Sequence, residues 1–122
     1  ALSPAPSYLE WSYHGIIRFL SGDYAGAIDA CDRVNGVVKL MPAWRIAALA
    51  HLGALSTAQE EASRFLNAIR SFWVGDVAPT DEAITLWLLQ GVPIIVASRW
   101  EALRDGLGRA GLPVRGIKPF SA

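Results

Sequence analysis

The sequence predicts an all-α fold of about six helices, and three observations support this prediction. Apolar residues recur at helical spacing through most of the 122 residues. Capping residues and glycines separate these segments where helices are expected to start and stop. Sustained apolar alternation, which is typical of strands, does not occur, although the short apolar run at residues 92–96 fits either class.

Two helices are expected in the first third of the chain. Ser7 and Glu10 have the spacing of a capping box and predict a helix over about residues 7–20. Asp23 is the expected N-cap of a second helix. Asn35 and Gly36 end or kink that second helix.

The middle of the chain predicts a third and a fourth helix. Pro42 suits the first turn of the third helix, which continues to Gly53 and fades near residue 55. Overlapping capping boxes at Ser56 and Thr57 predict the start of the fourth helix. This fourth helix is expected to stop near residue 73 and Gly75.

The last two helices have clear start and stop residues. Thr80 is the expected N-cap of a short fifth helix that Gly91 closes. Pro93 can open a sixth helix, which ends at Gly111 as a left-handed cap and cannot continue through Pro113. Residues 113–122 have no period and predict an irregular tail.

The composition indicates one domain and excludes several classes of function. A mass of 13.2 kDa suits a single core. Eleven basic and 11 acidic residues give a net charge of zero, which argues against nucleic acid as a partner. The chain is 52% hydrophobic and 18% charged, so we expect a partner to cover some apolar surface.

Other sequence features bear on location and chain length. The longest apolar stretch, residues 84–97, is interrupted by Gln90, Gly91 and Pro93, so no membrane span is expected. A single cysteine, Cys31, and the lack of a signal-peptide pattern predict a cytoplasmic protein. The start at Ala1 rather than methionine suggests a segment of a longer protein.

A short string occurs twice, 31 residues apart. The segments at residues 22–27 and 53–58 share glycine first, a large apolar residue third and alanine sixth, each at an expected helix–turn–helix junction. Glycine permits the tight turn, and the small alanine permits close helix packing. This pattern resembles the tetratricopeptide repeat, whose early aromatic and small positions are matched by Trp11 and Gly15.

The resemblance implies a short right-handed superhelix of antiparallel helix pairs. Repeat 1 would span about residues 7–41 and repeat 2 about 42–74, followed by a terminal helix pair at about 80–112. Residues 100–113 also resemble the ending GLRKAGLP of a bacterial group in which such repeats close a longer chain. In that group the upstream part is often a class III adenylate or guanylate cyclase or a winged-helix transcriptional regulator, so the resemblance implies a signalling protein.

Catalytic and metal-binding patterns are weak. His14 and His51 each lack a second ligand at metal-binding spacing within the same helix. Asp29 and Asp32 would raise the pKa of Cys31, which favours a packing role for this thiol. We therefore expect no catalytic residue, no metal and no cofactor, and we interpret the C-terminal arginines as a solvated face.

The expected function is therefore a non-catalytic protein-interaction or regulatory module. A concave face would present five residues to a protein or peptide segment, namely Tyr13, Trp44, Arg45, His51 and Trp87. The first helix carries more apolar residues than one face can bury, so it predicts a docking or homodimer face made of Leu9, Trp11, Ile16 and Phe19.

Two other functions remain open from sequence. One is a sensor that holds a small apolar ligand among four rings, those of Trp44, Phe65, Trp73 and Trp87. The other is a purely structural dimerisation unit. An enclosed cavity would favour the first alternative, and the mass in solution would test the second.

Overall fold

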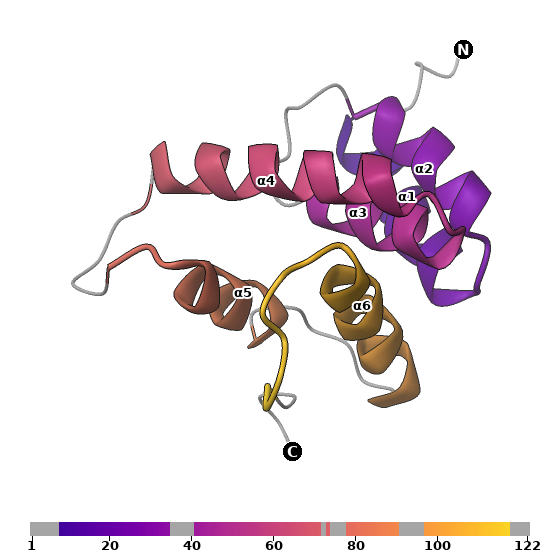
Figure 1. Ribbon diagram of the computed structural model, residues 1–122. Helices are drawn as coiled ribbons and strands as arrows, with labels where there is room; N and C mark the ends of the chain where they lie inside the picture. The colour runs from indigo at the N-terminus through magenta and orange to yellow at the C-terminus, as the bar shows by residue number, and fades with distance from the viewer. Residues whose placement is uncertain (1–7, 35–40, 72, 74–77, 91–96, 118–122) are drawn as a thin grey trace, which may run out of the picture.

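The computed structural model confirms the all-α class (Figure 1). It describes residues 8–34, 41–71, 73, 78–90 and 97–117, and these residues contain six α-helices and no strand. The expected cap at Ser7, the break at Asn35-Gly36, the stops at Gly75 and Gly91 and the start at Pro93 lie outside the described residues.

The helices form two hairpins followed by two further helices. In Figure 1, α1 and α2 lie at one end of the molecule, α5 lies at the other end, and α4 runs across one side. The bounds are α1 Tyr8–Leu20, α2 Tyr24–Asp32, α3 Met41–His51, α4 Leu55–Ser71, α5 Asp81–Gln90 and α6 Ala97–Arg109.

The two copies of the repeated string fold into the same turn. Gly22 and Gly53 have φ angles of 84° and 86°, in the left-handed region that favours glycine. The N–H of Asp23 donates to the carbonyl of Arg18 at 2.8 Å, and Ala54 donates in the same way to Leu49 at 3.0 Å. Both turns are therefore the same kind of helix C-cap, 31 residues apart.

The helix N-termini agree with the prediction at two turns and differ at one. The Asp23 carboxylate accepts from the N–H of Gly26 at 3.0 Å, and the Thr80 hydroxyl accepts from Ala83 at 3.1 Å, so both N-caps are confirmed. The capping boxes at Ser56 and Thr57 are wrong, because α4 already begins at Leu55. The predicted start is too late because α4 begins directly after the Gly53 turn, without a side-chain cap before it.

Helix α3 lies at the centre of the fold. It packs against α1, α2, α4 and α6, and eight of its 11 residues are buried. Many of these are alanines, whose small side chains allow four neighbouring helices to approach. The core continues through the inner face of α4, with Ala58, Phe65 and Ile69, and through α5 with Ile84 and Leu88.

Helix α6 lies along α3, whereas the sequence predicted a terminal pair with α5. A methyl group on Gly106 would lie 2.7 Å from the carbonyl oxygen of Ala47, so the two backbones are nearly in contact. One turn further along α3, His51 Nε2 lies 2.6 Å from the carbonyl oxygen of Ala102. Since later α3 residues meet earlier α6 residues, the two helices run antiparallel.

The end of α6 has the predicted cap. Gly111 has a φ of 101°, and the N–H of Leu112 donates to the carbonyl of Leu107 at 3.1 Å. At the other end of the helix, the indole of Trp100 is buried and donates to the carbonyl of Leu89 in α5 at 2.8 Å. Helix α6 therefore contacts both α3 and α5.

Candidate protein-interaction surface

The outer side of α1 exposes two large apolar side chains. Tyr13 is 58% exposed and Ile17 is 62% exposed, and they lie one turn apart on the same face. Ile16 and Leu20 are half-buried beside them and pack against the core. We call Tyr13, Ile16, Ile17 and Leu20 the α1 outer face.

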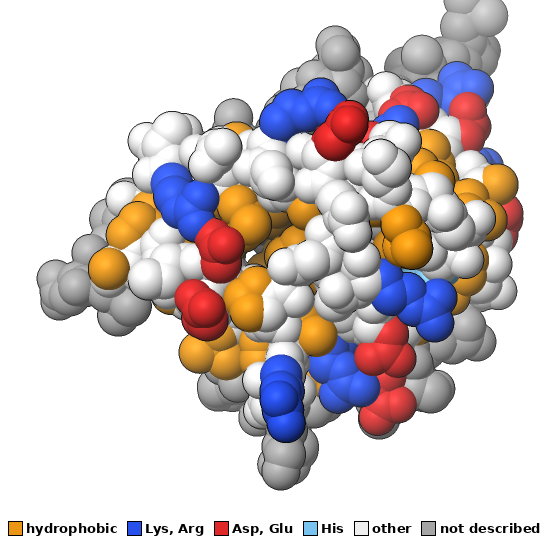
Figure 2. All heavy atoms as spheres, in the orientation of Figure 1, with side chains coloured by type: hydrophobic (Ala, Val, Ile, Leu, Met, Phe, Trp, Pro, Cys, Tyr) orange, Lys and Arg blue, Asp and Glu red, His pale blue; other side chains and the backbone are white. Residues whose placement is uncertain are grey.

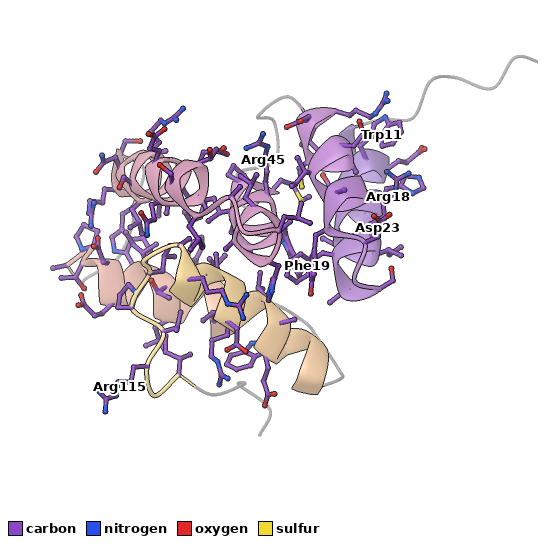
Figure 3. The ribbon with its side chains drawn as sticks, turned by 45° about the vertical axis from the view of Figure 1, so that its right-hand side comes forward. Trp11, Arg18, Phe19, Asp23, Arg45 and Arg115 are labelled. Atoms are coloured by element: carbon purple, nitrogen blue, oxygen red, sulfur yellow. The ribbon has the colours of Figure 1, made fainter. Side chains whose placement is uncertain are left out.

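The opposite edge of α1 is tied to α2. The guanidinium of Arg33 lies 4.7 Å from the ring centre of Trp11, and Arg18 Nη1 donates to the carbonyl of Gly26 at 3.1 Å. Figure 3 shows Trp11 and Arg18 on this edge, with Phe19 turned inward toward α3. Trp11, predicted as part of a docking face, is therefore half-buried and stacked within its own hairpin.

Ring and ion contacts join the first hairpin to α3. Phe19 meets Trp44 edge to face, with ring centres 5.3 Å apart. Tyr24 stacks on His51 at 4.6 Å. Asp32 accepts a hydrogen bond from Arg45 Nε at 2.8 Å. We call these three pairs the stacking contacts, because they join the α1–α2 hairpin to α3.

These contacts correct two sequence predictions. Trp44 is 4% exposed and Phe19 is 1% exposed, so neither faces outward as predicted. Both rings lie between α1 and α3, where burial of a large aromatic surface stabilises the fold. The helical period correctly placed both residues on apolar faces, but it does not say which neighbour covers a face.

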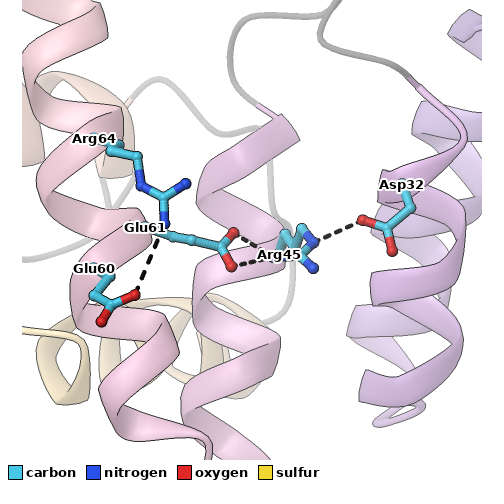
Figure 4. Close-up of polar contacts among 5 residues, drawn as sticks. All are labelled: Asp32, Arg45, Glu60, Glu61 and Arg64. Atoms are coloured by element: carbon cyan, nitrogen blue, oxygen red, sulfur yellow. Dashed lines mark hydrogen bonds and ion pairs between the residues drawn. The ribbon is translucent and has the colours of Figure 1, made fainter.

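Arg45 connects three helices rather than standing free on a concave face. Its guanidinium bonds Asp32 of α2 and Glu61 of α4, as Figure 4 shows. Burial lowers the pKa of this guanidinium, but its hydrogen bonds to Glu61 and Asp32 outweigh burial and raise the pKa. Because two carboxylates already neutralise the charge, Arg45 is held in a structural ion-pair cluster.

His51, another predicted contact residue, is also occupied within the fold. Its Nε2 lies at hydrogen-bonding distance from the carbonyl oxygen of Ala102. Because a carbonyl oxygen can only accept, Nε2 is the ring nitrogen that carries the hydrogen. Its ring is half-buried, stacked on Tyr24 and edge-on to Phe19. Helix α6 thus covers part of the face that the sequence assigned to a partner.

Trp87 is the predicted contact residue on α5, and it is 45% exposed. Its ring meets that of Trp73 edge to face, with centres 5.6 Å apart. Beside this pair, Arg70 donates to the carbonyl of Pro79 at 2.9 Å and pairs with Asp81, which ties the end of α4 to the start of α5. Leu86, the residue before Trp87, is 42% exposed, so α5 carries a second exposed apolar area, away from α1 (Figure 1).

The four rings of the ligand-sensor alternative lie in different surroundings. Trp44 and Phe65 are each 4% exposed in the core, and Trp44 contacts Phe19. Trp73 is half-buried and Trp87 exposed, and these two contact each other. Figure 2 shows hydrophobic side chains bordering a hollow between α4 and α5, but two of the four rings are packed core residues.

The described residues include one free cysteine, Cys31. Burial and the nearby Asp32 raise the pKa of the Cys31 thiol to about 12, despite the opposing charge of Arg45. Within the part of the chain that the structure describes, no three His, Cys, Asp or Glu side chains gather as metal ligands. Each helix in the described part of the chain is too short or too polar to cross a bilayer.

No match to a known protein family, a curated protein or a solved structure was found for this chain. The candidate surface therefore rests on the residues themselves. Of the predicted site residues, Tyr13 and Trp87 are exposed, Ile16 is half-buried, and the side chain of Leu9 lies outside the described residues. Ile17 is not among the predicted site residues, although its spacing of four from Tyr13 could have identified it.

Proposed function

We propose that this chain is a non-catalytic protein-interaction module that binds a partner through the α1 outer face. The observation that carries the proposal is the exposure of Tyr13 and Ile17 together on one helix face. Paired large apolar side chains at such spacing are the usual anchors of helix-mediated recognition. The tetratricopeptide-like ending supports a role as the C-terminal domain of a bacterial signalling protein, either a nucleotide cyclase or a transcriptional regulator.

Site-specific photo-crosslinking tests this proposal. A photoreactive phenylalanine analogue at position 17 is expected to give one discrete protein adduct in cells that make the full-length protein. Introducing Tyr13→Glu into the same chain should abolish the adduct, because a charge would enter the contact. Since Tyr13 is largely exposed, this change should alter the free energy of unfolding by about 0.5 kcal/mol or less.

A matched control uses the exposed polar surface of α4. Arg64 is exposed and pairs with Glu60 of the same helix at 3.9 Å (Figure 4). The same analogue at position 64 should give no such adduct. No adduct from position 17, or the same adduct from position 64, would contradict the proposal.

A further inference from the structure

We draw no further inference here: the strongest candidate, the second exposed apolar area that Leu86 and Trp87 form on α5, carries none because nothing in the structure shows what covers it.

Discussion

Gly106 of α6 and Ala47 of α3 lie in close contact. A methyl group on Gly106 would lie 2.8 Å from the Cβ of Ala47 and 2.9 Å from its Cα. Ala47 is a buried residue at the centre of α3, and the helices packed around α3 prevent it from moving away from α6. The contact explains why α6 lies along α3, because two small residues let the helix backbones touch.

Gly106→Ala should therefore destabilise the fold by about 1–3 kcal/mol, even though alanine favours helices more than glycine does. Urea denaturation followed by circular dichroism measures the change. Gly108→Ala is the matched control, because its methyl group would meet a terminal methyl of the half-buried Val114, which can move. Similar midpoints for Gly106→Ala and the unmodified chain would contradict the packing described for α6.

The N-cap of α2 predicts a non-additive pair of substitutions. Asp23→Ala should cost about 1 kcal/mol, because the N–H of Gly26 loses its acceptor. Gly26→Ala should remove the same bond, since its methyl group would overlap the Asp23 carboxylate. The double variant should then be less destabilised than the sum of the two, and full additivity in the denaturation series would argue against this cap.

The repeat makes a further prediction at two alanines. Ala27 and Ala58 are 31 residues apart, and both are fully buried at the start of the second helix of a hairpin. Ala27→Leu and Ala58→Leu should each overpack their hairpin and cost about 1–3 kcal/mol. Ala68→Leu on the exposed side of α4 is the control and should change little. Unchanged midpoints with unchanged denaturation slopes for both core variants would argue against the equivalence of the two hairpins.

Cys31 should be inert in the folded protein. Raising its pKa from 9.0 to about 12 lowers the thiolate population at pH 8 about a thousandfold, and the side chain is also buried. A chromogenic disulfide reagent should therefore label the native thiol at least about a thousand times more slowly than the urea-unfolded thiol. Rapid labelling under native conditions would contradict the burial of Cys31 between α1 and α3.

The same shift predicts a dependence of stability on alkaline pH. The folded pKa lies above the unfolded value, so the stabilisation is fully present below pH 9 and is lost as the pH rises toward 12. Cys31→Ala should flatten this part of the curve of unfolding free energy against pH. Parallel curves for the two proteins between pH 9 and 11 would show that Cys31 does not contribute.

Local features of the fold could be predicted from sequence because their causes are local. Glycine at positions 22, 53 and 111 adopts the left-handed backbone that these turns need, and Asp23 and Thr80 cap the helices that follow them. The start of α4 was missed because two capping boxes next to each other suggested a later boundary than the Gly53 turn imposes.

The arrangement of helices could not be predicted in the same way. The helical period identified Trp44 and His51 as residues of one apolar face, but α1, α2 and α6 cover that face through contacts distant in sequence. The placement of α6 depends on small residues of α3 and α6 that face each other. The spacing of apolar residues within one helix does not show which helix lies opposite. The sequence places Ile17 one turn from Tyr13, but only the structure shows that both side chains are exposed.

Oxidative footprinting with hydroxyl radicals tests whether a partner covers the α1 outer face. The purified chain is compared with the same chain in an extract of the cells that produce it, and the oxidation of Tyr13 is set against that of Trp87, which is exposed on α5. An interaction through the α1 outer face predicts that the extract protects Tyr13 while the Trp87 rate stays the same. Protection of Trp87 with Tyr13 oxidised at its original rate would contradict the account.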